Sequence, residues 1–325
     1  MTCRRQRGAA LLAAMLTVTL VATLTAAALW QQFRAVEVEA AERARVQSAW
    51  VLTGALDWSR LILREDGRSG GADHLAEPWA IALQEARLSS FLAADKNNNA
   101  QDQDDVNTQA FLSGQITDLQ ARLNVLNLLD GKAVSPPDLR SFAKLFSLLG
   151  LAPNELNSLA ENLRFAADTD PNNQSGNQAG LLPQSTDQLR GLGLSARTLA
   201  VLEPYITVLP QRTPLNLNTA SAEAISASIP GLELADAQRL LRARGLTHFR
   251  SLADAGAQLG GAAEEINQGR HSVATQFFEV RGRLRLDTVA VEERSVVQRT
   301  GIEVKTLQRQ RGSLNLAAGA AQAGG

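Results

Sequence analysis

The sequence is poor in the residues that build metal centres and disulfide bonds. Its 325 residues include one cysteine, Cys3, and three histidines, His74, His248 and His271. A single cysteine permits no disulfide bond within the chain, and the widely separated histidines lack the spacing of a zinc site. Aromatic residues make up only 4% of the chain, so leucine, valine and alanine must supply most of any core.

The chain also lacks an excess of charge of either sign. Lysine and arginine together number 32, aspartate and glutamate number 33, and the formal net charge is −1. Proteins that bind nucleic acid or acidic lipid over a broad surface usually carry a basic surplus. The composition is therefore that of a globular chain, long enough for one large domain or two ordinary ones.

Charge is missing altogether from the 22 residues between Ala9 and Trp30. As an α-helix rising about 1.5 Å per residue, this run would span about 33 Å, enough to cross a hydrocarbon core of about 30 Å. Arg4, Arg5 and Arg7 precede the run. The positive-inside rule therefore predicts a single-pass membrane protein with a cytoplasmic N-terminus and the remaining chain on the far side.

The helix is predicted to continue beyond the membrane. Gln31 to Arg64 contains no proline and a single glycine, Gly54, and apolar or small residues recur at steps of three and four. One helix of more than 50 residues, half in lipid and half in water, is the simplest account. Two alternatives remain: a secretory signal with a small-residue cleavage site, Ala26-x-Ala28, and an uncleaved signal anchor.

The border between the charged start and the apolar run, Arg7-Gly8-Ala9, resembles the leader of type IV pilin-like proteins. The resemblance implies that a prepilin peptidase cuts between Gly8 and Ala9 and that Ala9 is then N-methylated. Most pilin-like subunits carry glutamate as the fifth mature residue, where it pairs with the N-terminal ammonium of the subunit ahead; here that residue is Ala13. A buried carboxylate is costly unless it is paired, and a subunit with nothing ahead of it needs none. We therefore expect this chain at a filament tip.

The first part of the chain beyond the long helix predicts strands and then short helices. Ala110 to Leu129 begins with partial alternation and contains Gly114, which favours a pair of strands. From residue 132 onward, apolar residues recur at helical spacing instead. Leu156, Leu159 and Leu163 form the expected buried stripe of one such helix, with Asn154 as its N-cap.

The C-terminal part returns to alternation. Apolar residues alternate from Phe278 to Val291, and Thr300-Gly301 favours a turn into a last strand. Three antiparallel strands that follow a helical block indicate an α+β domain with a helical insertion. The low-complexity end of the chain predicts disorder.

Two motif-like stretches do not support catalysis. Gly67-Arg-Ser69-Gly-Gly71 has the spacing of a serine-hydrolase elbow, but that motif needs a strand before it, and a long helix is predicted there. Asp95, Asn97 and Asn99 begin like a calcium loop, yet the required glycine and bidentate glutamate are missing. Solvated loops explain both stretches, and no catalytic residue is predicted.

Leu215 to Leu252 resembles a helix-hairpin-helix module, so a membrane-anchored DNA receptor of a competence system is the alternative function. In DNA-binding modules the hairpin carries two glycines, which let backbone N–H groups approach a phosphate. Here the hairpin is Pro230-Gly231-Leu232-Glu233, and Glu233 puts a negative charge where the phosphate would lie. The four arginines between residues 214 and 260 are balanced by four carboxylates, whereas phosphate binding requires a basic surplus. A packing unit is therefore favoured, with no nucleic acid as partner.

Several stretches, taken in order, resemble the minor pseudopilin K family of the type II secretion system over nearly the full chain. They are the leader without its acidic residue, AEPWA at 76–80, ITDLQARLNVLNLL, YITVLPQRTPLNLNTAS, and the closing QFFEVRGRLRL and VVQRTG. The resemblance implies a non-enzymatic subunit with its bulk in the periplasm, capping the tip of a pseudopilus that supports export across the outer membrane. The implied partners are minor pseudopilins I and J, then H and the major pseudopilin G.

The resemblance also implies bound calcium, held by acidic residues of the α/β domain. Asp168 and Asp170 look like the start of such a segment. The glutamate and tyrosines expected shortly afterwards are missing, and only Asp187 follows nearby. Because Ca²⁺ takes about six to eight oxygen ligands, a solvated turn is favoured over a calcium site here.

Together these inferences predict an α+β fold in which a pilin-like long N-terminal helix packs on an antiparallel sheet with a large all-α inserted domain. The predicted divisions are a leader at 1–8, a membrane helix at 9–30, the continuing helix at 31–65, an α/β domain at 66–131 and 263–312, an inserted helical domain at 132–262 and a disordered tail at 313–325.

Overall fold

The computed structural model describes residues 7–88, 110–168, 181–286 and 289–315. The chain divides into two compact units, Met1–Gly54 and Ala55–Gly325. A single helix of 63 residues, α1 (Arg7–Ser69), forms the described part of the first unit and continues into the second. This confirms the predicted uninterrupted helix of more than 50 residues.

In the first unit, α1 satisfies its polar groups within the helix. The hydroxyls of Thr17 and Thr19 donate to the carbonyls of Ala14 and Leu16, at 2.9 and 3.0 Å. Side-chain hydroxyls that bond back to the preceding turn leave no unpaired donor, which matters in a segment surrounded by hydrocarbon. Further along, where charges return, Arg43 pairs with Glu39 one turn earlier at 2.9 Å. The order Glu then Arg at this spacing stabilises an exposed helix by a few tenths of a kcal/mol.

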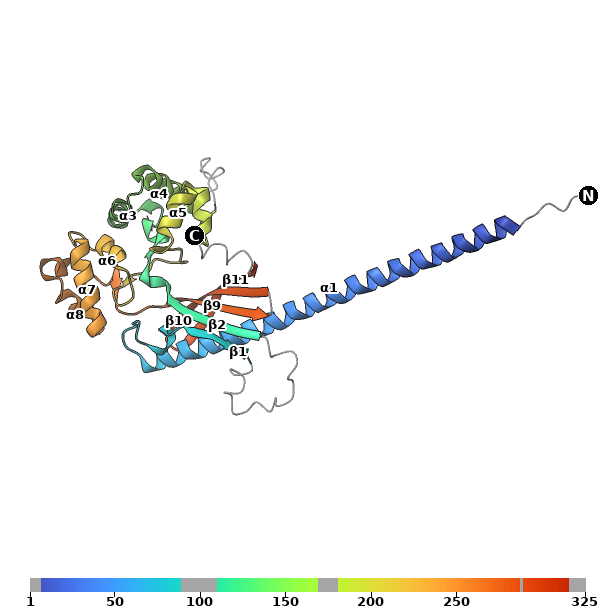
Figure 1. The fold of residues 1–325 in the computed structure, drawn as a ribbon. Coiled ribbons are helices and arrows are strands. Elements are labelled where there is room, and N and C mark those ends of the chain that lie inside the picture. The colour runs from blue at the N-terminus through green and yellow to red at the C-terminus, as the bar shows by residue number, and fades with distance from the viewer. Residues whose placement is uncertain (1–6, 89–109, 169–180, 287–288, 316–325) are drawn as a thin grey trace, which may run out of the picture. The chain divides into compact units, whose positions relative to one another are not determined.

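The second unit is built on a five-stranded antiparallel sheet (Figure 1). In spatial order the strands are β1 (Leu83–Arg87), β2 (Ala110–Asp118), β9 (Phe277–Leu286), β10 (Val289–Thr300) and β11 (Glu303–Asn315). The last three confirm the predicted C-terminal strands. The turn into β11 passes through Gly301, whose φ of 59° lies in the left-handed region that glycine adopts without strain.

The predicted strand pair around Gly114 is wrong, because β2 passes through this glycine without a turn. Gly114 pairs with Gly282 of β9 on one side and with Leu83 of β1 on the other. A Cβ at Gly114 would lie 3.3 Å from the carbonyl oxygen of Arg281, which is a tight contact. The glycine therefore permits close approach of two strands, a role that resembles a turn signal in the sequence.

The C-terminal turns of α1 pack on one face of this sheet, as predicted. Leu56 and Leu63 of α1 are buried against Phe278 and Val297, and Trp79 closes the cluster with its ring 5.2 Å from that of Phe278. Trp79 lies in the short 3₁₀ helix η1 (Pro78–Ala80). Because each of these apolar side chains leaves water only when helix and sheet meet, the contact stabilises both elements.

A large insertion separates β2 from β9, so the chain leaves the sheet after Asp118 and returns at Phe277. Its α-helices are α3 (Pro136–Leu148), α4 (Pro153–Ala167), α5 (Ala196–Leu202), α6 (Ala222–Ser228), α7 (Leu234–Leu246) and α8 (Leu252–Gly256). Its 3₁₀ helices are η2 (Leu119–Ala121), η3 (Val125–Leu128), η5 (Thr186–Leu192) and η6 (Gly260–Glu265). The insertion is wider than the predicted 132–262.

The insertion is mainly helical but also contains pairs of two-residue strands. The pairs are β3 (Leu123–Asn124) with β6 (Ile206–Thr207), β4 (Leu129–Asp130) with β5 (Ala133–Val134), and β7 (Leu215–Asn216) with β8 (His271–Ser272). The helical pattern of the sequence gave no sign of these pairs. β3, soon after the chain leaves the sheet, pairs with β6, and β8, shortly before the chain returns to the sheet, pairs with β7.

The insertion has its own core, which includes the predicted stripe. Leu156, Leu159 and Leu163 of α4 are buried together in one cluster. The predicted N-cap is wrong: Ala152 occupies that position and makes no side-chain cap, while Pro153 is the first helical residue. Proline is favoured there because it needs no N–H partner and its φ is already helical.

The predicted tail begins too early in the chain. Strand β11 runs to Asn315, and its residues 313–315 pair with residues 289–291 of β10. Alanine and glycine dominate the sequence only after this point, and residues 316–325 lie outside the described residues.

Candidate functional site

The first candidate site is the apolar surface of α1. An 18-residue window within it has a mean hydropathy of 2.1 and no buried residue, and its length and composition would allow it to cross a membrane. Leu16, for example, is 67% exposed. A soluble protein rarely leaves so large an apolar surface uncovered, because its exposure to water is unfavourable. This surface therefore calls for lipid or other helices around it.

The leader residues lie at the start of this helix. Gly8 and Ala9 are in the first turn of α1, and Ala13 is exposed one turn further on. Cleavage after Gly8 and methylation of Ala9 stay predictions. The side chain at position 13 is a methyl group and carries no charge.

A second site joins the sheet to the insertion through a buried carboxylate. Asp118, at the end of β2, is 2% exposed. It accepts hydrogen bonds from the backbone N–H of Gln120, the amide of Asn216, and the hydroxyls of Thr219 and Thr275, at 2.6, 3.0, 2.6 and 2.6 Å. These donors come from three separate parts of the chain. We call the five residues the Asp118 network.

The Asp118 network was not predicted from the sequence. Burial raises the pKa of Asp118, and the four donors oppose that rise by stabilising the anion. The carboxylate therefore depends on all four neighbours for compensation. Because the donors are up to 157 residues away in the chain, no local pattern could have revealed their meeting.

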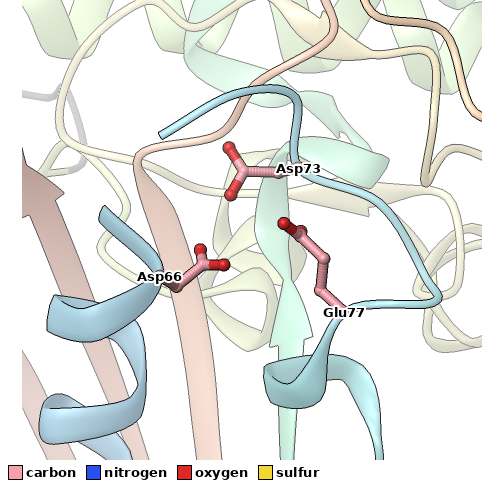
Figure 2. A group of neighbouring side chains, drawn as sticks. All are labelled: Asp66, Asp73 and Glu77. Carbon is pink, nitrogen blue, oxygen red and sulfur yellow. The ribbon is translucent and has the colours of Figure 1, made fainter. Parts of the chain in front are cut away.

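Three further carboxylates lie close together (Figure 2), and one of them, Asp73, adjoins the Asp118 network because Asn216 donates to its backbone carbonyl at 3.2 Å. Oxygen atoms of Asp66, Asp73 and Glu77 lie within 4.8 Å of one another. Arg299 of β10 forms ion pairs with both aspartates, at 2.5 Å to Asp73, and the backbone N–H of Thr275 donates to Asp73 at 2.7 Å. Asp66 lies in the last turns of α1, so the cluster ties the end of this helix to the end of β10. We call these four charged residues the Arg299 cluster.

The Arg299 cluster lines a cavity of about 170 Å³. Burial raises the pKa of Glu77 to about 7, although the carboxylate accepts hydrogen bonds from the His74 backbone and the Trp79 indole, both at 2.8 Å. Burial also raises the pKa of Asp73, while Arg299 opposes the rise. The arginine supplies a counter-charge for both aspartates and joins the end of α1, the loop after it and the end of β10.

The predicted calcium residues are only partly described. Asp168 follows α4 and pairs with Lys132 at 3.0 Å, while Asp170 lies outside the described residues. Among the residues that the structure describes, the acidic side chains close enough together to hold a metal ion are Asp66, Asp73 and Glu77, and Asp168 is not one of them.

The helix-hairpin-helix resemblance has a structural basis, since α6 and α7 are joined by a tight hairpin through Gly231, with φ of 71°. The hairpin is covered by α3. Lys144 donates to the carbonyl of Leu232 at 2.5 Å and approaches that of Ile229 at 3.5 Å, and burial lowers the pKa of this lysine. The hairpin is therefore a packing element of the insertion.

The hydrolase-like stretch is also structural. Ser69 is the last residue of α1, and its hydroxyl donates to the carbonyl of Glu65 at 3.2 Å. A helix precedes this serine, as expected from the sequence, so the strand that a nucleophile elbow needs is not there.

Comparisons with known proteins agree on one family. Two family models match, both described as type II secretion system protein K: one over residues 121–211 and one over residues 215–274. Both matches fall in the insertion. A Pseudomonas aeruginosa protein called type II secretion system protein K is 27% identical over 94% of this chain and 90% of its own length. A Klebsiella pneumoniae protein of the same description is 27% identical over 95% of this chain and 97% of its own length.

A solved structure has the same fold. It is a chain of the GspK–GspI–GspJ complex from the type 2 secretion system of enterotoxigenic Escherichia coli. The two share a TM-score of 0.64 with 17% sequence identity, over 84% of this chain and 98% of the other.

A long apolar N-terminal helix, an antiparallel sheet and a helical insertion between two of its strands define a pilin-like subunit. The insertion distinguishes it from a subunit with the plain pilin fold. The chain belongs to the protein K family of the type II secretion system, and it is a minor pseudopilin.

Proposed function

We propose that this minor pseudopilin caps the tip of the type II pseudopilus and thereby supports protein export across the outer membrane. The observation that carries the proposal is Ala13, an uncharged residue in a helix otherwise built to pack among apolar helices. A subunit with another one ahead of it would need a carboxylate at this position to pair with the ammonium group of its neighbour. A subunit at the end has no such neighbour.

The insertion supports the same position. It forms a separate core and separates two neighbouring strands of the sheet. A subunit in the middle of a filament must leave room for the next one, whereas a subunit at the end can carry additional bulk. The insertion is also the part of the chain that both family models match.

Electron microscopy of pseudopili labelled with gold-bearing antibodies against the insertion tests the tip position. We expect label at one end of each filament. Label distributed along the shaft would contradict the proposal. A matched pair of variants sharpens the test: Ala13→Glu gives no gain in tip assembly over Ala14→Glu, because neither carboxylate meets an ammonium group ahead of it.

For partners, we propose minor pseudopilins I and J, followed by H and the major pseudopilin G. The support is the solved relative of similar fold, which comes from a GspK–GspI–GspJ complex. Co-purification of the full chain from detergent-solubilised membranes tests this. I and J should elute with the chain in equal amounts, and their absence would count against the proposal.

We propose that the chain crosses the inner membrane once, with a cytoplasmic leader and a periplasmic bulk. The support is the exposed apolar window of α1 with its preceding arginines. Prepilin peptidase would remove residues 1–8. Gly8→Ala should leave the leader attached and block incorporation into filaments, whereas Gly54→Ala, a control at a glycine of α1 far from the leader, should be processed normally.

A structural role without catalysis is proposed for the whole chain. The contacts of the helix-hairpin-helix module favour a packing role over DNA binding. Lys144 donates to a carbonyl of the hairpin, and the carboxylate of Glu233 lies near this lysine. A gel-shift experiment with the full chain in detergent distinguishes a packing role from DNA binding. Retarded DNA that is released by added salt would favour the DNA receptor instead.

Calcium at Asp168 and Asp170 is a further prediction for titration calorimetry. If the two carboxylates bind the ion, heat is released with the wild-type chain and is lost in the Asp168→Asn variant. Equal heats from the two chains would rule out Asp168 as a ligand.

A further inference from the structure

Two of the three histidines lie against each other, although 174 positions separate them in the sequence (248 − 74). The rings of His74 and His248 are stacked, with centroids 3.8 Å apart and planes 14° from parallel. His74 lies in the loop between α1 and η1, and His248 lies in the loop between α7 and α8. The pair, which we call the histidine stack, connects the sheet side of the second unit to its insertion.

The loops on both sides of the histidine stack are anchored by hydrogen bonds, and the carbonyl of Val273 in the insertion accepts from both anchors. Asp73, next to His74, binds Arg299 of the sheet, and its N–H donates to Val273 at 2.9 Å. Phe249, next to His248, exchanges two hydrogen bonds with Asn218 of the insertion, both at 2.9 Å. A change in the stack therefore acts between two well-anchored loops.

We propose that the histidine stack is an acid-sensitive contact, which holds the α7–α8 loop of the insertion to the loop after α1 at neutral pH and releases it in acid. Protonation weakens two contacts of His74. The first is the stack itself, because two imidazolium ions at this separation repel each other. The second is a hydrogen bond from the backbone N–H of Ala76 to Nδ1 of His74 at 3.2 Å, which is lost when that nitrogen takes a proton.

The charged surroundings agree with release in acid. Burial and the facing His248 both lower the pKa of His74, while Asp66 of α1 opposes them weakly. The Asp66 carboxylate is itself paired with Arg299, so it compensates little of a new positive charge on the ring. The nearby Glu77 accepts from the His74 backbone and not from its ring. A lowered pKa means that the folded state binds this proton less readily than the open state does. Falling pH therefore favours opening.

The scarcity of histidine makes a direct measurement possible. The full chain in detergent, labelled only at histidine, gives three imidazole signals, which single variants assign. We expect the His74 signal in the wild-type chain to titrate below 6.5 and to move toward that value in the His248→Phe variant, which keeps a flat ring but cannot take a proton. A His74 midpoint at or above 6.5 in the wild type would overturn the proposal without any variant.

Hydrogen exchange then tests the release. After correction for intrinsic exchange, peptides covering 72–77 and 246–250 should open more at pH 5.0 than at pH 7.5 in the wild type, because the lowered pKa of His74 makes proton uptake favour the open state. Peptides of strand β9 serve as an internal control and should keep their protection. In His248→Phe the acid effect should diminish, because the repulsion between the rings is gone while the burial of His74 and its bond to Ala76 remain. Equal opening at both pH values in the wild type, or an undiminished acid effect in the variant, would contradict the proposal.

Discussion

The two units of this chain are stabilised in different ways. In the first unit, Met1–Gly54, the hydrogen bonds and ion pairs described for side chains of α1 join residues three or four apart. Ala55–Gly325 depends on contacts over long distances in the chain, such as the Asp118 network and the pairing of Arg299 with Asp66 and Asp73. A local structure of this kind needs only its own sequence and a suitable solvent. The second unit needs its distant parts to meet, so single substitutions there have larger effects.

The largest effect is expected at Asp118. Asp118→Leu leaves four buried donors without an acceptor, which should lower the free energy of unfolding by about 3–5 kcal/mol, since each unsatisfied buried group costs about 1–3 kcal/mol and part is recovered by relaxation. Urea unfolding of the full chain in a mild detergent measures this. Asp130→Leu, at an exposed aspartate of β4, is the matched control and should change stability by less than about 0.5 kcal/mol. Similar losses from both variants would show that the network adds nothing special.

The next largest loss of stability is expected on the face of α1 that packs on the sheet, and none of similar size on its exposed face. Leu63 is fully buried against the sheet, while Leu61 is 55% exposed on the other side of the helix. Leu63→Ala should destabilise the second unit by about 3 kcal/mol, as is usual for a buried leucine, and Leu61→Ala by much less. The same urea experiment compares them. If Leu61→Ala proved the more harmful, helix α1 would pack on the sheet by a different face.

A pH effect follows from His271, which is buried in the insertion. Burial lowers its pKa to about 4 from the ordinary 6.5, and its Nδ1 accepts from the Asn267 N–H at 3.3 Å. Because the unfolded chain takes up the proton first, stability is complete above pH 6.5 and falls as the pH approaches 4. At pH 5 the loss should be about 2 kcal/mol, from about 1.4 kcal/mol per pKa unit.

Unfolding at pH 7.5 and pH 5 measures that loss. His271→Asn, which keeps an acceptor for the same N–H but does not titrate, should show a flatter pH dependence than the wild type. An identical slope in wild type and variant would assign the acid sensitivity to other groups.

The smallest effect is expected at Gly54, the boundary between the units. A Cβ added there would meet no atom within 4 Å. Gly54→Ala should therefore increase helix stability by about 0.5–1 kcal/mol through the lower conformational entropy of the unfolded chain. Helical signal in circular dichroism at rising temperature measures it. A loss of helix would mean that the glycine has a contact role in the assembled protein.

The same contrast explains how much could be predicted from the sequence. The long helix, the C-terminal strands and the stripe of Leu156, Leu159 and Leu163 all follow from local periodicity, and the structure has them. Gly114 was misjudged because a glycine needed for close strand approach looks like a turn signal. Asn154 was misjudged because Pro153 already provides the start of α4.

The candidate sites were harder to predict than the fold. The charge-free run pointed directly to the apolar surface of α1, because that surface is contiguous in sequence. The Arg299 cluster, the Asp118 network and the histidine stack each bring together residues from distant segments, and only the folded chain shows them. A contact between residues that are far apart in the sequence leaves no periodic trace in it.

Mass spectrometry of the mature chain isolated from membranes tests the central claim most directly, namely that the apolar helix stays attached to the folded second unit and is trimmed only at its leader. The account predicts a chain that begins at Ala9 and carries one additional methyl group on its N-terminal amine. A mature chain that begins at Leu29, after removal of the apolar run, would contradict it.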